Sequence, residues 1–184
     1  MLLAFVRPRR TLTKRRSNEP TLDTDPIEFV RANWEKAGQH QAEQFAAAVS
    51  IFRTHQLVSA AFARALKPYG INRTTYHVMS ALFMSENMTR PLGQLGKNVM
   101  AHPATVTLII DQLESRKLVV RSNHPTDRRT TLATLTPAGA RLVAKASAAL
   151  AEENFGLADT NDDAARKLNN SLRRVRKALD DVVE

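Results

Sequence analysis

A group of hydroxyl, imidazole and small side chains opens a segment with helical hydrophobic periodicity near residue 103. The free N–H groups and positive dipole end of a helix start attract anions. Threonine hydroxyls can hydrogen-bond phosphates or base edges, and the threonine methyl can pack on thymine. We therefore predict that a polyanion contacts this helix start. The residues in this prediction are His102, Pro103, Ala104, Thr105 and Thr107.

A second polar group follows in the loop from residue 123 to 129, between two short β-branched runs. Arginine on a hairpin tip can enter the minor groove of DNA, so we predict contacts from Arg128 and Arg129, with His124 beside them. Asp127 is expected to brace the loop by a charge-assisted bond to an arginine. An isolated arginine pair is more often a solvated surface feature, but its place in a hairpin after such a helix favours nucleic-acid contact.

The elements that must position these groups follow from hydrophobic periodicity and from capping residues. Asp25-Pro26 opens a first helix and Thr136-Pro137 opens a later one, with Asp25 and Thr136 as N-caps. The predicted helices span 26–37, 39–67, 73–85, 91–99, 103–117, 137–157 and 162–184, and the predicted strands span 118–120 and 130–136. The fold class is mainly α with a small β-hairpin wing, and the central order of elements is that of a winged helix-turn-helix.

The spacing of apolar residues predicts which helix faces are buried in the core and which face lacks an assigned partner. One buried set is Tyr76, Met79, Leu82 and Phe83, and another is Val106, Ile109, Ile110 and Leu113. The last helix has a seam that needs a partner helix from the same chain or from a second copy. Its residues are Ala165, Leu168, Leu172, Val175, Leu179 and Val182.

Four regions follow from these predictions. They are a disordered basic arm at 1–24, N-terminal scaffold and dimerisation helices at 25–71, a winged helix-turn-helix at 72–136, and C-terminal dimerisation helices at 137–184. The arm could equally reflect a start assigned too early.

Composition narrows the class of protein. The 184 residues carry a net charge of +9 and include no cysteine, which excludes disulfides and zinc fingers and favours a polyanionic partner. No apolar run reaches the ~20 residues of a membrane-spanning helix. At the N-terminus the apolar stretch precedes its charges, the reverse of a secretory signal. We therefore expect a cytoplasmic protein without a membrane partner.

The run from His102 to Leu142 resembles the signature of the MarR family of winged-helix regulators. That signature combines T-V-T-x-x-x-D-x-L-E, D-x-R and L-T-x-x-G, found here at 105–114, 127–129 and 135–139. The resemblance covers about residues 26–184. It implies a recognition helix in the major groove, Arg129 in the minor groove with Asp127 bracing the wing, and a homodimer built by the first and last helices.

The resemblance also implies a repressor that binds a pseudo-palindromic operator and is released by a small aromatic or phenolic effector. Two residues depart from the family pattern. Leu108 replaces a polar residue, which predicts sparse base readout, and Lys117 replaces glycine, which predicts a less tight turn before the first strand.

Other readings remain open. Trp34, the single tryptophan, is expected to be a core or interface anchor, with a ligand-pocket role as the alternative because its helix resembles one in the urate-responsive branch. The five histidines lack metal-ligand spacing, and no cofactor or catalytic motif is present, so we predict neither a metal site nor an enzyme. An architectural DNA-binding protein without sequence preference is the alternative function, followed by a winged helix used only for protein contacts.

Overall fold

The computed structural model describes residues 25–127 and 129–181 and divides into two compact units after Arg53. α1 (Pro26–Lys36) lies in the first unit, and α2 (Ala42–Leu66) begins in the first and ends in the second. All later elements belong to the second unit. The predicted arm at 1–24, Arg128 and the seam residue Val182 lie outside the described residues.

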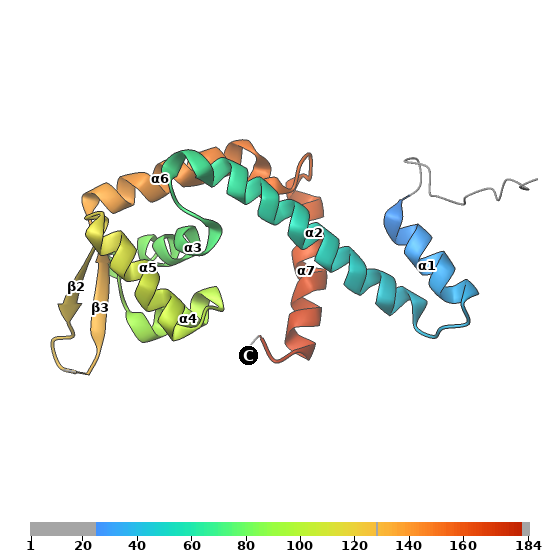
Figure 1. Cartoon of the computed structure of the whole chain (residues 1–184), viewed down its shortest axis with the longest axis horizontal. Coiled ribbons are helices and arrows are strands. Elements are labelled where there is room, and N and C mark those ends of the chain that lie inside the picture. The colour runs from blue at the N-terminus through green and yellow to red at the C-terminus, as the bar shows by residue number, and fades with distance from the viewer. Residues whose placement is uncertain (1–24, 128, 182–184) are drawn as a thin grey trace, which may run out of the picture. The chain divides into compact units, whose positions relative to one another are not determined.

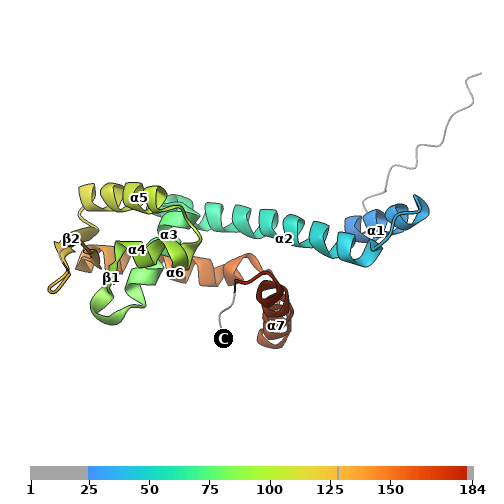
Figure 2. The same ribbon diagram turned by 90° about the horizontal axis from the view of Figure 1, so that it is seen from below.

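The second unit has the predicted order of elements with one addition, the strand β1. Its elements after α2 are η1 (Lys67–Tyr69), α3 (Arg73–Phe83), η2 (Glu86–Met88), β1 (Thr89–Pro91), α4 (Leu92–Val99), α5 (Pro103–Ser115), β2 (Val119–Asn123), β3 (Thr131–Leu135), α6 (Pro137–Glu152), η3 (Asn154–Gly156) and α7 (Asp162–Ala178). Both views place α4, α5 and the strands together at one end of this unit (Figure 1, Figure 2).

Side-chain caps fix where the helices begin. The Asp25 carboxylate accepts a bond from the Ile27 N–H, and the Thr136 hydroxyl accepts one from the Gly139 N–H, as the two predicted N-caps require. Asn72 caps α3 in the same way. Pro68 and Gly70 end α2, as predicted, because Gly70 adopts a left-handed conformation (φ 62°) after η1.

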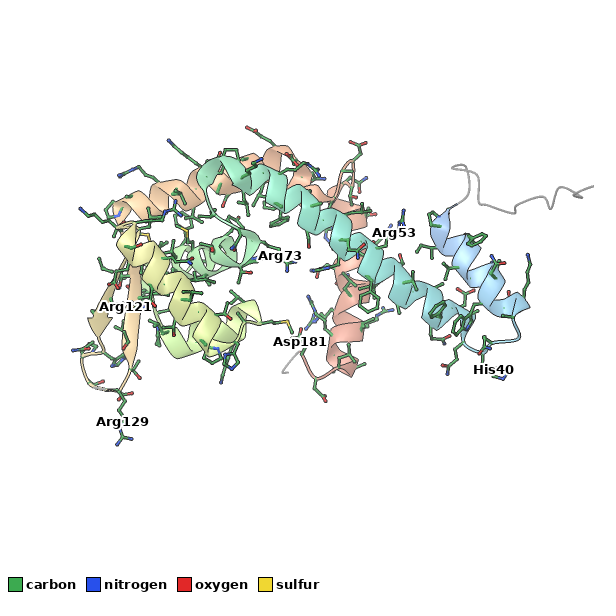
Figure 3. All side chains as sticks on the ribbon, in the orientation of Figure 1. His40, Arg53, Arg73, Arg121, Arg129 and Asp181 are labelled. Carbon is green, nitrogen blue, oxygen red and sulfur yellow. The ribbon has the colours of Figure 1, made fainter. Side chains whose placement is uncertain are left out.

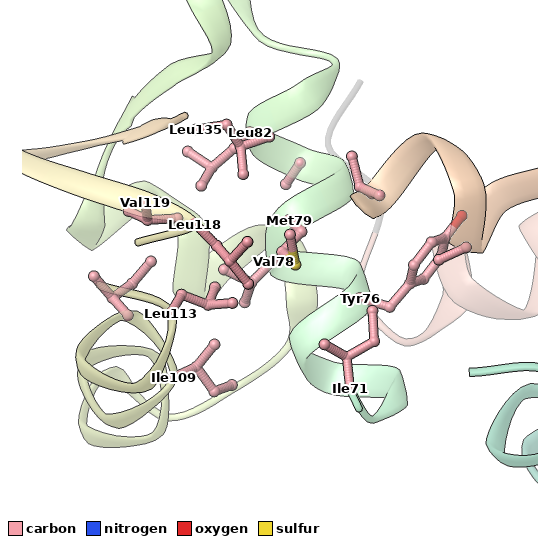
Figure 4. Close-up of a cluster of buried hydrophobic side chains, with 14 of the residues drawn as sticks. Ile71, Tyr76, Val78, Met79, Leu82, Ile109, Leu113, Leu118, Val119 and Leu135 are labelled. Atoms are coloured by element: carbon pink, nitrogen blue, oxygen red, sulfur yellow. The ribbon is translucent and has the colours of Figure 1, made fainter. Parts of the chain in front are cut away.

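α3 lies at the centre of the core and packs against α4, α5, α6 and β3. Figure 4 shows its Val78 and Met79 directed toward Leu113 of α5 and toward Leu118. The predicted buried face of α5 is confirmed, because all four of its residues are at most 5% exposed. This core fixes the position of α5 relative to the strands.

The sheet has the order β1-β3-β2 and is antiparallel throughout. The hairpin register pairs Val119 with Leu135 and Asn123 with Thr131. The short strand β1 was not predicted, because three residues carry too little periodicity to identify a strand. It is held at the edge of the sheet by pairing with β3 and by a 2.8 Å hydroxyl bond between Thr89 and Thr134.

Several predicted boundaries were wrong at element ends. α6 stops at Glu152 because Asn154 and Phe155 have positive φ, and α7 stops at Ala178. Phe83 was expected in the core but is 45% exposed, since Leu82 takes the inward position.

The turn after α5 is tight, contrary to prediction, although lysine stands where the family has glycine. Lys117 adopts a left-handed conformation (φ 58°). Its N–H donates to the Glu114 carbonyl at 2.8 Å, and the Leu118 N–H donates to the Leu113 carbonyl at 2.9 Å. A non-glycine residue therefore adopts here the backbone conformation that glycine adopts without strain.

Candidate nucleic-acid interface

The start of α5 presents a polar face opposite to its buried one. Pro103, Ala104, Thr105 and Thr107 are exposed, whereas Val106 between them is buried. His102 is the N-cap, and its Nδ1 accepts a bond from the Ala104 N–H at 3.2 Å. This face therefore offers backbone dipoles and hydroxyls without a carboxylate.

The two threonines on this face have different free hydrogen-bonding groups. The Thr107 hydroxyl donates to the Pro103 carbonyl at 3.2 Å, so its oxygen faces outward as an acceptor. Thr105 has no side-chain partner within the described part of the chain, so its hydroxyl can donate or accept. Leu108 is 57% exposed on the same side, which adds an apolar contact and no base-reading polar group.

The Asp127 carboxylate braces the wing loop by accepting hydrogen bonds from two other residues of the same loop. One carboxylate oxygen accepts from the Arg129 backbone N–H at 3.0 Å and the other from the Thr130 hydroxyl at 2.6 Å. These two bonds, with the nearby His124, lower the pKa of Asp127 below its usual range. The sequence predicted a bond to an arginine side chain, whereas the structure shows one to an arginine backbone.

Bracing of the loop leaves the Arg129 side chain available. Arg129 is exposed, and Figure 3 shows it at the tip of the hairpin, directed away from the body of the protein. A cavity of about 580 Å³ between α4 and the wing is lined by Gln94 and Lys97 together with His124 and Arg129. Gln94 and Lys97 were not predicted as interface residues, because nothing in the sequence brings α4 beside the wing.

Arg121 joins the wing to α5 and was also not predicted. Its guanidinium contacts Asp111 at 2.6 Å and Glu114 at 2.7 Å, and it donates to the Thr107 carbonyl at 3.3 Å. Burial opposes the charged form, but hydrogen bonds to Asp111 and Glu114 raise the pKa of Arg121 above its ordinary value. Acidic residues three apart on a predicted helix, followed by an arginine on the next strand, were the available signal.

Comparison with known proteins identifies the family. The family model described as "MarR family" matches residues 71–131. The uncharacterized HTH-type transcriptional regulator YhbI of Bacillus subtilis (strain 168) is 32% identical over 114 residues, which are 60% of this chain and 73% of YhbI. This chain belongs to the MarR family.

Two further proteins support that conclusion. The HTH-type transcriptional regulator MhqR of Bacillus subtilis (strain 168) is 27% identical over 95 residues, which cover 52% of this chain and 64% of MhqR, slightly less than two thirds. The crystal structure of Sco5413, a MarR family transcriptional regulator from Streptomyces coelicolor, matches with a TM-score of 0.69 and 30% identity over 77% of this chain and 99% of that one. Membership confirms the predicted winged-helix fold and makes this chain a DNA-binding transcriptional regulator, not an enzyme.

The structure explains several residues of the MarR-family signature. Asp111 and Glu114 hold Arg121, and Asp127 holds the wing loop. Gly139 lies where a Cβ would overlap the Leu118 carbonyl oxygen, so α6 can approach the sheet only with glycine there. Much of the signature therefore maintains the placement of α5 and the wing.

Trp34 lies in the first unit, where it is half-buried. Its ring stacks on Phe45 with centroids 3.8 Å apart, and its Nε1 donates to the His40 carbonyl at 2.9 Å. Both its face and its N–H therefore have protein partners. Within the described ranges, no group of three or more metal-ligating side chains could hold an ion, and no helix is long and apolar enough to cross a membrane.

A second cavity, of about 380 Å³, lies along α3 in the second unit. It is lined by His77, Ser80, Ala81, Met84, Arg90 and Val99. The Ser80 hydroxyl is buried without a hydrogen-bond partner. Burial lowers the pKa of His77, and the positive charge of Arg73 lowers it further. The cavity thus combines a cation, an unsatisfied hydroxyl and an apolar wall.

Proposed function

We propose that this MarR-family protein is a sequence-specific, double-stranded DNA-binding repressor that works as a homodimer in the cytoplasm. The observation that carries the proposal is the pairing of an uncharged, hydroxyl-bearing start of α5 with a braced wing that presents Arg129. α5 is suited to the major groove, where Thr105 and Thr107 meet base edges, and Arg129 is suited to the minor groove. The contacts are assigned to His102, Pro103, Ala104, Thr105, Thr107, His124, Arg128 and Arg129.

The homodimer rests on the apolar seam of α7. No residue of this fully described helix is buried, although Leu168 and Val175 keep the spacing of a helix-packing face and are 40% and 45% exposed. A second copy would cover this face. Two-fold symmetry then places half-sites about 10 base pairs apart on a pseudo-palindromic operator.

We further propose that a small aromatic or phenolic effector with a negative charge releases the DNA and that it occupies the cavity along α3. Arg90 supplies the countercharge, and Ser80 supplies the hydroxyl that otherwise lacks a partner. Benzoate and 4-hydroxybenzoate should weaken DNA binding, whereas uncharged benzyl alcohol should not, and Arg90→Gln should abolish the response. If Trp34→Phe rather than Arg90→Gln abolishes the response, the effector binds at Trp34.

The test of DNA binding is the affinity for the DNA upstream of the protein's own gene, measured against unrelated competitor DNA across a salt series. We expect a preference of ~10³ or more. Arg129→Ala should weaken binding sharply, whereas Arg166→Ala on α7 removes the same charge and should change little. Binding that competitor abolishes would favour the architectural function. Unchanged DNA affinity in Arg129→Ala would show that the wing is not part of the interface.

A further inference from the structure

The two elements of the candidate interface begin with the same dipeptide, His-Pro. His102-Pro103 opens α5 and His124-Pro125 opens the wing loop, and no other histidine of the chain precedes a proline. Proline fixes its own φ and has no N–H, so the next residue is the first that can donate back to the histidine ring. The repeated dipeptide therefore predicts the same local turn at both places.

The structure shows that turn twice. Nδ1 of His102 accepts a bond from the N–H of Ala104 at 3.2 Å. Nδ1 of His124 accepts from the N–H groups of Thr126 and Asp127, both at 3.3 Å. In each case the imidazole caps the backbone two residues ahead, as an asparagine side chain does in an Asx-turn.

These bonds assign the role of acceptor to Nδ1 of both rings. A backbone N–H can only donate, so Nδ1 must carry a lone pair and the single ring proton must lie on Nε2. Protonation would turn Nδ1 into a donor facing another donor and would remove the cap. Nε2 of either ring has no partner among the described residues and remains a free donor.

The turn at the start of α1 shows what an aspartate does at an equivalent position before proline. Asp25-Pro26 makes the same bond, from the Ile27 N–H to the Asp25 carboxylate at 2.8 Å, at the start of α1. A carboxylate at the start of α5 would repel DNA phosphates, and the wing already has one in Asp127, whose two oxygens are occupied by the loop itself. A neutral imidazole supplies the acceptor toward the backbone without a negative charge and a donor on its other side.

We propose that His102 and His124 are positioning residues that hold α5 and the wing for DNA as neutral caps, with the proton on Nε2. Only the expected effect on operator affinity rests on the DNA-binding function proposed above. The caps themselves belong to the free protein. The charged groups around His124 are Asp127 in its own loop and Lys97 and Arg129 across the cavity beside α4. No charged partner of the His102 ring is found in the described chain.

Matched substitutions separate a cap from a phosphate contact. Asparagine places its Oδ1 where Nδ1 lies, whereas glutamine reaches the position of Nε2. We expect His102→Asn and His124→Asn to keep operator affinity within about threefold. His102→Gln and His124→Gln should lose on the order of fivefold or more each, because DNA binding must then order a turn that has lost its cap. Circular dichroism and thermal unfolding confirm that each variant is folded.

Every other pattern overturns the proposal. If the glutamine variants bind normally and the asparagine variants do not, Nε2 contacts DNA and the cap is immaterial. Equal tolerance or equal loss in both series also rejects the cap.

A measurement without DNA separates this proposal from the proposed function. The ring ¹⁵N shifts of His102 and His124 in the free protein should show the Nε2–H form at pH 7.5, assigned by comparison with the two asparagine variants. An Nδ1–H form would overturn the caps even if Arg129→Ala abolished DNA binding. Conversely, the Nε2–H form with an inert Arg129→Ala would leave the caps standing and refute the interface.

Discussion

The winged-helix region and α7 use apolar residues in opposite ways. α3 and α5 each bury a full face, and Met79, Leu82 and Ile110 are completely inaccessible to solvent. α7 has the same kind of spacing, but none of its residues is fully buried, and only Ala165 and Leu172 are partly covered. The first region satisfies its hydrophobic pattern within one chain, whereas the second leaves its pattern for a partner. A periodic apolar face therefore indicates burial without saying by which molecule.

The largest expected effect is on stability, in the winged-helix region, whose apolar face is buried within the chain. Ile110→Ala removes a fully buried side chain between α5 and the rest of the core and should reduce the free energy of unfolding by about 2–5 kcal/mol. Urea denaturation measures this loss. As a control, Leu108→Ala lies on the exposed face of the same helix and should change stability by less than about 0.5 kcal/mol. Equal losses in both variants would contradict the assigned faces of α5.

The next effect concerns the face of α7 that lacks a partner. Replacing both Leu168 and Val175 by glutamate should leave the winged helix folded but weaken self-association by at least about a hundredfold, roughly 2.7 kcal/mol. The reason is that two charges would have to be desolvated in the seam. Sedimentation velocity across a concentration series measures this. The control is Arg166→Glu with Arg173→Glu, elsewhere on α7. A wild-type monomer at all concentrations would refute the dimer.

Arg121→Gln tests the joint between α5 and the wing. It should destabilise by about 1–2 kcal/mol, a range reduced for the partial exposure of the site, because Asp111 and Glu114 lose their shared partner. DNA affinity should fall by more than the stability loss explains, since α5 and the wing are no longer held together. Chemical denaturation and DNA titration on the same variant separate the two effects. Affinity unchanged in a destabilised variant would show that Arg121 only stabilises the fold.

Lys117→Gly should stabilise the protein, by up to about 1 kcal/mol. Lysine at φ 58° carries the strain of a left-handed conformation that glycine avoids, and the gain is partly offset by the greater freedom of glycine in the unfolded chain. Lys97→Gly in α4 is the control, and it should destabilise because that position is helical. A loss of stability in Lys117→Gly would mean that the lysine side chain has an unrecognised role.

The smallest effect is confined to the wing loop. The pKa of Asp127 lies below that of an ordinary aspartate, so its bracing is complete above about pH 4 and is lost as the pH falls through the lowered value. The amide signals of Arg129 and Thr130 should shift in that acidic range and not at higher pH. In Asp127→Asn the acid transition should disappear. A wild-type transition at or above the ordinary pKa would contradict the bracing bonds.

Most of the fold was predictable because local signals agreed with one another. Asp25-Pro26 and Thr136-Pro137 marked helix starts, and the spacing of Val106, Ile109, Ile110 and Leu113 marked a buried face. β1 could not be predicted, because it exists only through its pairing with β3. The end of α6 was also missed, since its stop depends on Asn154 and Phe155, two non-glycine residues that adopt left-handed conformations just before Gly156.

By itself the sequence determined which residues form the helices, which face of α5 is buried, and that hydroxyl, imidazole and arginine groups gather between residues 102 and 129. The tertiary structure decided which of those groups contact one another and which neighbours they bond. It joined Arg121 to Asp111 and Glu114, set Lys97 beside His124 and Arg129, and directed Asp127 to a backbone N–H. Periodicity and capping act over a few residues and are written in the chain, whereas these contacts depend on how α4, α5 and the hairpin pack around α3.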